Sequence, residues 1–116
     1  NLAKLCMAAT KGNLDLESAE WDDKTALGVV MAANGYPNSY QKGETITIPD
    51  ASSESKVFHA GTKLEGGNIL SNGGRVLCAT SLGLNLEEAQ EKAYILVNMV
   101  NWDGSYYRTD IGFKGL

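Results

Sequence analysis

The stretch from Lys56 to Ser81 constrains the fold of this chain more than any other part. It reads KVFHAGTKLEGGNILSNGGRVLCATS, in which two apolar-rich runs flank a turn centred on Gly66 and Gly67. Consecutive glycines permit the positive φ values that a tight hairpin needs. A second glycine pair, Gly73–Gly74, interrupts the returning strand. The sequence therefore predicts two strands joined by a tight turn, and we expect this hairpin to carry the functional surface.

The remaining segments predict an α+β fold with a mainly antiparallel, barrel-like or sandwich-like sheet. Asn85 and Glu88 form a capping-box pattern at the start of an amphipathic helix that runs to about Asn101 and packs on the sheet. Hairpins rather than repeated crossovers join the strands, which favours antiparallel pairing. The other expected elements are a helix over 1–11, a connector with Trp21 as an aromatic anchor over 14–24, a strand buried on both faces over 25–33, an edge strand over 45–48 and a last strand over 106–113.

Length and charge exclude several classes of protein. The 116 residues suit one domain, and the formal net charge of −4 argues against a general nucleic-acid or membrane surface, which needs a cationic face. The longest apolar run, residues 26–33, is too short to cross a bilayer. A small anionic ligand, which needs only one or two positioned donors, remains compatible with this composition.

The two cysteines, Cys6 and Cys78, lie in apolar surroundings and are predicted to be small buried residues. A single bridge between them stays open, but two cysteines do not make a disulfide framework. A reducing, cytoplasmic setting is the better match. The chain also lacks an initiator methionine, from which we expect it to be part of a longer protein.

The hairpin holds the side chains that are most able to take part in binding or catalysis. His59 is the one histidine of the chain, and it is either an acid, base or ligand donor, or a neutral histidine hydrogen-bonded inside the sheet. A metal site is disfavoured because no second histidine and no paired cysteine spacing accompany it. The run Asn72-Gly73-Gly74-Arg75 can direct backbone N–H groups and a guanidinium at an anion, or can be a bulge with a surface arginine.

Arg108 is the other arginine, expected on the last strand. It is either a second anion contact or the partner of Asp110 in a surface ion pair, which contributes less than about 1 kcal/mol. The sequence holds no GxxxxGK phosphate loop, no GxGxxG dinucleotide motif and no serine nucleophile elbow. The residues alone thus indicate an α+β domain with one candidate anion-binding hairpin.

Taken together, several blocks resemble the C-terminal domain of the phosphoribosylamine–glycine ligase family of the ATP-grasp superfamily. The blocks are ALGVVMAANGYPNSYQKGETIT, KVFHAGTK, NGGRVLCATSLG, EEAQEKAY and YYRTDIGF. The resemblance implies a ligase that joins glycine to 5-phosphoribosylamine through a glycyl phosphate, giving glycinamide ribonucleotide, ADP and phosphate. ATP and Mg²⁺ or Mn²⁺ would be bound upstream, so neither a catalytic residue nor a cofactor is expected in this segment.

The resemblance also implies an organisation and a set of contacts. Residues 1–13 would end a helix that leads from the ATP-grasp core, and residues 14–116 would form the C-terminal domain, with the N-terminal and ATP-grasp domains of the same protein as its partners. The implied substrate-binding residues are His59, Asn72, Gly73, Gly74, Arg75 and Arg108. The chain departs from the family pattern in two places. The family often has GGYPG where this chain has Asn34-Gly35-Tyr36-Pro37-Asn38, and it often has a second basic residue where this chain has Thr109, which leaves Arg108 alone. The alternatives are a stand-alone module that binds a phosphorylated metabolite and a purely structural packing domain.

Overall fold

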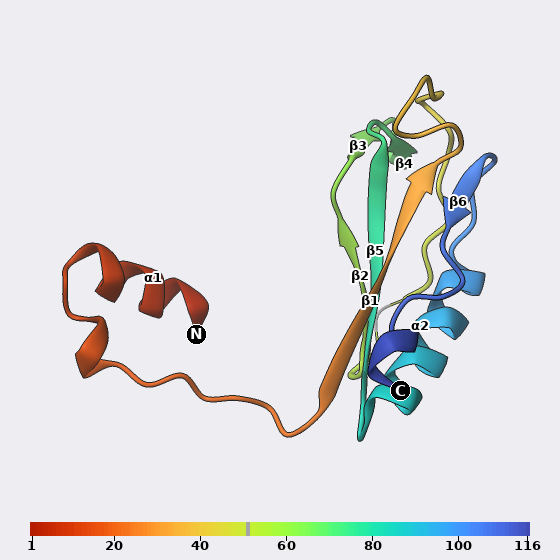
Figure 1. Ribbon diagram of the computed structural model, residues 1–116. Coiled ribbons are helices and arrows are strands. Elements are labelled where there is room, and N and C mark those ends of the chain that lie inside the picture. The colour runs from red at the N-terminus through yellow and green to blue at the C-terminus, as the bar shows by residue number, and fades with distance from the viewer. Residues whose placement is uncertain (51) are drawn as a thin grey trace.

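The computed structural model describes residues 1–50 and 52–116. Its strands form a four-stranded antiparallel sheet in the order β2-β5-β1-β6 and a separate two-stranded sheet, β3-β4 (Figure 1). The elements are α1 (Leu2–Thr10), η1 (Leu14–Leu16), β1 (Thr25–Ala33), β2 (Ser55–His59), β3 (Thr62–Glu65), β4 (Asn68–Ser71), β5 (Arg75–Gly83), α2 (Leu86–Met99), β6 (Ser105–Tyr107) and η2 (Phe113–Gly115). The α+β class with antiparallel strands is confirmed. The larger sheet has free edges at β2 and β6, so it is open rather than closed into a barrel.

The core lies between α2 and one face of the larger sheet. Val29 and Met31 of β1 and Leu77 of β5 point into it and are fully buried, and the apolar stripe of α2 covers them. The expectation that residues 25–33 are buried on both faces is wrong for most of the strand. Burial alternates along β1, and Val30 is 45% exposed, because a helix covers only one face of the sheet (Figure 1).

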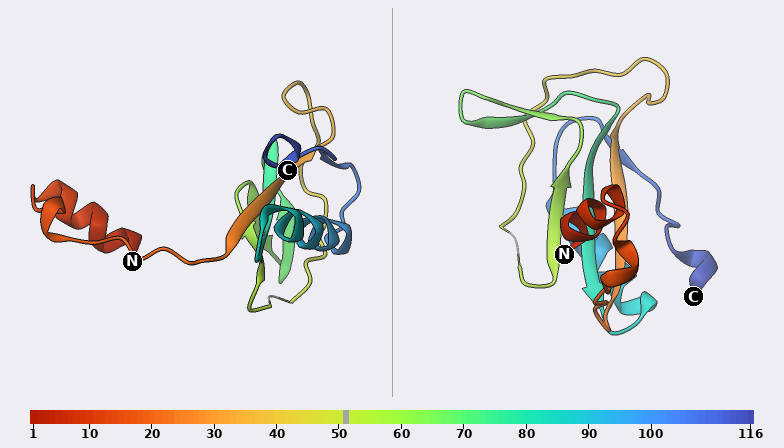
Figure 2. Two further views of the ribbon diagram at one scale, coloured as in Figure 1. Left: turned by 60° about the horizontal axis from the view of Figure 1, so that its bottom comes forward. Right: turned by 90° about the vertical axis from the view of Figure 1, so that its left-hand side faces the viewer.

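The turn predicted at Gly66–Gly67 is confirmed, with φ values of 58° and 81°. Each predicted strand of the hairpin is nevertheless divided in two. β2 and β5 pair within the larger sheet, whereas β3 and β4 pair with each other in the smaller one and leave the end of the larger sheet as an arm (Figure 2, right view). An isolated bridge between Thr45 and Leu70 also joins β4 to the segment before β2. The strands are divided at Gly61 and Gly73, and the contact between these two residues is described below.

The start of α2 is as the capping-box pattern predicts. The Asn85 side chain accepts a hydrogen bond from the Glu88 backbone N–H at 2.9 Å, and the Glu88 carboxylate accepts one from the Leu84 N–H at 2.7 Å. These contacts satisfy N–H groups that have no partner inside the helix. The helix then ends at Met99, close to the expected end.

The N-terminal helix α1 is also confirmed, and Gly12, with a positive φ of 73°, follows its end at Thr10. It packs mainly on η1 and is set apart from the sheet (Figures 1 and 2). Two expectations for this region are wrong: Trp21 is 88% exposed rather than an anchor, and Cys6 is exposed. Cys78 is half-buried, and both thiols are free.

The predicted last strand is shorter than expected. Only Ser105–Tyr107 pairs with β1, so Arg108 lies beyond the strand rather than on it. Side chains of α2 take the place of a neighbouring strand: the Tyr94 hydroxyl donates to the Arg108 carbonyl at 2.8 Å and accepts from the Ile111 N–H at 3.0 Å. The edge strand expected over 45–48 is reduced to isolated bridges at Thr45 and Thr47.

Glu54 joins three elements through ion pairs. Its carboxylate contacts Lys24, at the start of β1, at 2.5 Å and Lys92, on α2, at 2.7 Å. Lys92 also pairs with Glu88 at 2.7 Å, one turn earlier on the helix. Hydrogen bonds from Lys24 and Lys92 lower the pKa of Glu54 from 4.5 to about 2.

This lowered pKa predicts an acid-dependent loss of stability. Because the pKa of Glu54 falls on folding, its contribution is complete above about pH 4.5 and disappears as the pH drops towards 2. We therefore expect Glu54→Gln to lower Tm at pH 7, and this difference to shrink to nothing near pH 2. Glu91→Gln, which removes an exposed carboxylate of α2, is the control and should show no such trend. A constant Tm difference for Glu54→Gln at all pH values would contradict the prediction.

Candidate functional site

The division of the hairpin brings two backbone segments into direct contact. A Cβ atom on Gly61 would lie 2.8 Å from the Gly73 Cα and 2.6 Å from the Arg75 carbonyl oxygen, so no side chain fits there. The Asn72 N–H donates to the Gly61 carbonyl at 2.7 Å across this crossing. At Gly74, the residue after Gly73, a Cβ would overlap the Tyr36 ring, whose nearest carbon would lie 2.1 Å away. Close packing thus accounts for both glycines of the pair.

Arg75 follows the crossing, the point where the backbone at Gly61 contacts that at Gly73, and its side chain is exposed. In the described part of the chain it takes part in none of the ion pairs. Its Cα pairs with Ala32, which in turn pairs with Tyr106, so the register places all three in one row across the sheet. A guanidinium that is not engaged in an ion pair can bind an anion through two parallel hydrogen bonds.

His59 ends β2 beside the same crossing. It is exposed rather than enclosed in the sheet, and its Nδ1 lies 3.1 Å from the Thr62 hydroxyl. The exposure has a simple cause, because β2 is an edge strand and α2 covers the central strands. The structure therefore gathers His59, Asn72, Gly73, Gly74 and Arg75 at one end of the larger sheet.

Arg108 does not join this group. It follows β6, which lies at the opposite edge of the sheet from β2. Its guanidinium binds the Asp110 carboxylate at 2.8 and 2.5 Å, and this hydrogen bonding raises the pKa of Arg108 and lowers that of Asp110. The ion pair between Arg108 and Asp110, one of the two alternatives considered from the sequence, is therefore formed.

The face of the sheet opposite α2 is bare and partly apolar. Phe58, Cys78 and Val30 form one row across β2, β5 and β1, and the side chains of Phe58 and of Tyr106, at the opposite edge on β6, are about half exposed. Exposed apolar side chains gathered on one face are typical of an interaction surface. Arg75 lies at the end of this face, beside the crossing.

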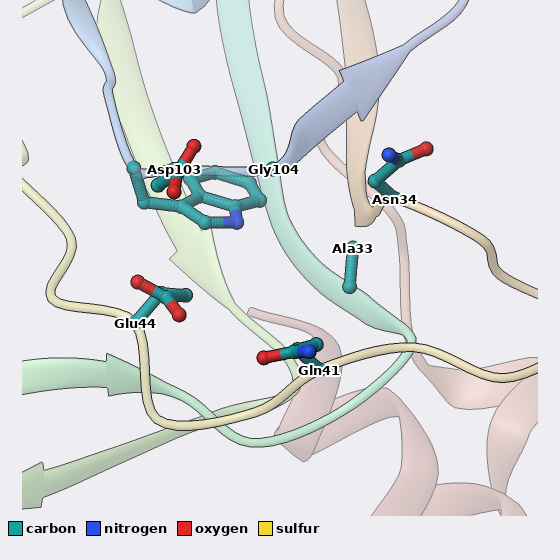
Figure 3. Close-up of a pocket in the computed structure, with 7 residues that line it drawn as sticks. Ala33, Asn34, Gln41, Glu44, Asp103 and Gly104 are labelled. Carbon is teal, nitrogen blue, oxygen red and sulfur yellow. The ribbon is translucent and has the colours of Figure 1, made fainter.

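A pocket that sequence reasoning missed lies between the end of β1 and the turn before β6. Its volume is about 280 Å³, and Figure 3 shows Gln41 and Glu44 facing Asn34 and Gly104 across it. Its lining is Ala33, Asn34, Gln41, Glu44, Trp102, Asp103 and Gly104. Residues 33–44 supply one part of this lining and residues 102–104, distant in sequence, supply the other, so no local spacing reveals the pocket.

The walls of the pocket are held by backbone hydrogen bonds. The Asn34 N–H donates to the Gly104 carbonyl at 2.7 Å, which joins the two parts of the lining. Within the first part, Glu44 is fixed by Ser71 of β4, whose hydroxyl accepts from the Glu44 N–H at 3.1 Å and whose N–H donates to the Glu44 carbonyl at 2.9 Å. The pocket is therefore a preformed feature of the fold.

Neither a metal-binding cluster nor a membrane-spanning helix is found in residues 1–50 and 52–116. No three His, Cys, Asp or Glu side chains gather there to hold a metal ion. The helices of these residues are too short or too polar to cross a bilayer.

An open antiparallel sheet with one covering helix, a bare face and an exposed arginine defines an α+β domain. Residues 26–114 match the family model of the phosphoribosylglycinamide synthetase C domain, and the chain belongs to this family. Relatives named phosphoribosylamine–glycine ligase match all of this chain: that of Allochromatium vinosum is 52% identical, that of Salmonella typhimurium 50% and that of Vibrio vulnificus 48%.

The structure is similar to a solved relative as well. The crystal structure of phosphoribosylamine–glycine ligase from Thermotoga maritima matches 92% of this chain with a TM-score of 0.75 and 37% identity. The match takes up 27% of that chain. Likewise, this chain spans only 28% of the length of each of the three relatives above.

Proposed function

We propose that this domain is the C-terminal part of an ATP-dependent ligase that joins glycine to 5-phosphoribosylamine. The observation that carries the proposal is the 48–52% identity over the whole chain to relatives named phosphoribosylamine–glycine ligase. The reaction would form a glycyl phosphate and then glycinamide ribonucleotide, releasing ADP and phosphate. It would use ATP and Mg²⁺ or Mn²⁺ bound by the N-terminal and ATP-grasp parts of the protein, in the cytoplasm. This domain would contribute to substrate binding and not to the chemical step.

The bare sheet face is the surface proposed to meet those other parts. Its half-exposed Phe58 and Val30 would gain stabilisation by leaving water, at roughly 25 cal/mol for each Å² of apolar surface buried. Arg75 at the end of this face would then point into the cleft between the domains. There it can neutralise the ribose phosphate of the amine substrate, because its guanidinium has no carboxylate partner among the described residues.

Arg75→Ala in the complete ligase is expected to lower kcat/KM for phosphoribosylamine about tenfold or more, the loss associated with one charged hydrogen bond. Arg75→Lys should recover part of this loss, since it keeps the charge without the planar fork. Steady-state kinetics with phosphoribosylamine as the varied substrate measures both. Lys11→Ala, which removes an exposed cation next to the end of helix α1, far from the sheet, is the control.

Unchanged kinetics for Arg75→Ala would contradict the role of Arg75 and favour a packing domain. The stand-alone alternative has its own test. Titration of the 116-residue chain with glycinamide ribonucleotide, followed by amide chemical shifts, should give saturable binding only when the other domains are present. Tight binding by the chain alone would favour an independent metabolite-binding module.

A further inference from the structure

The ring of Tyr36 covers the backbone of Gly74, the residue immediately before Arg75. Gly74 is buried, although it lies at the end of the sheet, just before β5. A Cβ atom on Gly74 would lie 2.1 Å from Cδ2 and 2.5 Å from Cε2 of Tyr36, and the three atoms nearest to that position all belong to this ring. The Gly74 carbonyl also accepts a hydrogen bond from the Ala33 N–H at 2.8 Å. Gly74 is therefore held both by the end of β1 and by an aromatic ring.

This contact offsets the conformational freedom of two consecutive glycines. Glycine has more accessible backbone conformations than any other residue, so a glycine pair leaves the side chain that follows it poorly placed unless the pair is held. Ordering this backbone before a ligand arrives removes that ordering cost from binding. At Gly73 the order comes from the contact with Gly61, and at Gly74 it comes from the ring of Tyr36.

Tyr36 is itself anchored in the fold. Its loop is tight at Gly35, where φ is 91° and a Cβ atom would lie 2.2 Å from the Ser39 carbonyl oxygen. The ring packs edge-on against that of Tyr40, with 6.0 Å between the ring centroids and 63° between the ring planes. Tyr40 in turn packs on the hydrophobic core. A continuous set of contacts thus leads from the core through the two tyrosine rings to Gly74.

We propose that Tyr36 is a positioning residue for Arg75. Its ring fixes the backbone of Gly73 and Gly74, and this backbone fixes the point from which the Arg75 side chain extends. Tyr36 does not need to touch the substrate, because its effect passes through Arg75. The inference rests on the proposed function only for what Arg75 binds, the phosphate of the amine substrate. The ordering of the glycine pair by the ring is independent of that function.

Hydrogen–deuterium exchange of the complete ligase, followed by mass spectrometry, measures the order of residues 72–75 without reference to activity. Tyr36→Ala should accelerate exchange in this segment about tenfold or more, because the glycine pair then opens locally. Tyr36→Phe keeps the ring and should exchange as the wild type does. Phe113→Ala removes another partly exposed ring, on η2, and is the control that should leave the segment unchanged.

A steric exchange tests the contact between the ring and Gly74. Gly74 does not have a positive φ, so alanine suits its backbone once the ring is absent. Gly74→Ala alone should accelerate exchange of residues 72–75, because its Cβ overlaps Tyr36. In the Tyr36→Ala background the same substitution should slow exchange, because the overlap is gone and alanine restricts the backbone.

Steady-state kinetics of the same variants connects this order with the substrate. Tyr36→Ala should raise KM for phosphoribosylamine about threefold or more, and by no more than Arg75→Ala does, with kcat and KM for ATP unchanged. Tyr36→Phe should retain the wild-type KM. In the Arg75→Ala background, Tyr36→Ala should have no further effect, because both residues act through one contact. A purely structural role would lower the active fraction and therefore kcat, instead of changing one KM.

Equal exchange of residues 72–75 in the wild type and in Tyr36→Ala would overturn the proposal. The same holds if Tyr36→Phe loses order as Tyr36→Ala does, or if the kinetic effect of Tyr36→Ala adds to that of Arg75→Ala. If Arg75→Ala itself leaves the kinetics unchanged, the proposed substrate role of Arg75 fails. The exchange measurements then still decide whether Tyr36 orders the segment, so the two failures are distinguishable.

Discussion

Gly83→Ala is expected to lower the free energy of unfolding by about 3 kcal/mol or more, at the upper end of the range for overpacking. Gly83 ends β5, where the chain turns into α2. A Cβ atom there would lie 2.3 Å from the Ala89 nitrogen and 2.8 Å from the Glu88 carbonyl carbon. These are backbone atoms of a capped helix, so relief requires the helix to move off the sheet. Urea unfolding followed by far-UV circular dichroism measures the loss.

Comparison of Gly83→Ala with Gly43→Ala separates the stability lost to steric overlap from the stability lost to backbone strain. Unlike Gly83, Gly43 has a positive φ, 94°, and a Cβ there meets nothing within 4 Å. Its replacement should therefore cost only the strain of the left-handed conformation, about 1–2 kcal/mol. If Gly83→Ala costs no more than Gly43→Ala, the close contact between β5 and α2 is not a constraint on the fold.

Leu77→Ala should cost about 2–5 kcal/mol, the range for removing a leucine from a packed core. Leu77 is fully buried and pairs with Met31 on one side and His59 on the other, so it lies at the centre of the sheet. Neighbouring strands fix the backbone around it, which limits how far the resulting cavity can collapse. Denaturant unfolding of the same chain measures this loss.

Leu64→Ala makes the same chemical change on the surface. Leu64 is 76% exposed on the β3–β4 arm, outside the core. Its replacement should change the free energy of unfolding by less than about 0.5 kcal/mol. Similar losses for the two leucine variants would mean that the arm and the core contribute equally to stability, against the burial observed.

Elements with local sequence signals were predicted well. The caps of α2 and the Gly66–Gly67 turn depend on residues within a few positions of each other, and both are formed as expected. The same holds for α1 (Leu2–Thr10), which Asn1 caps at its start and which Gly12, with its positive φ, follows. Such signals act through nearby backbone groups, so they need no knowledge of the tertiary structure.

Errors arose where distant residues decide the outcome. Residues 108–111 have a strand-like composition, yet hydroxyl and amide groups of Tyr94 and Gln90 bind their backbone in place of a strand. The apolar run 25–33 suggested burial on both faces, because the sequence does not show how many layers cover a sheet. The glycines at 73 and 74 were predicted to direct backbone N–H groups at an anion, but contact with Gly61 and Tyr36 accounts for them without an anion. Whether Arg75 binds substrate stays a prediction.

The pairing of β1 with β5 also determines the order in which the molecule can assemble. This pairing joins residues as distant in sequence as Thr25 and Gly83, whereas β3 and β4 need only close a turn. Long-range contacts close large loops and slow folding, so the β2–β5 hairpin can form before β1 joins it. The segment that β1 closes off carries Asn34 and Glu44. We therefore expect the pocket to form late in folding, only after β1 has joined the sheet.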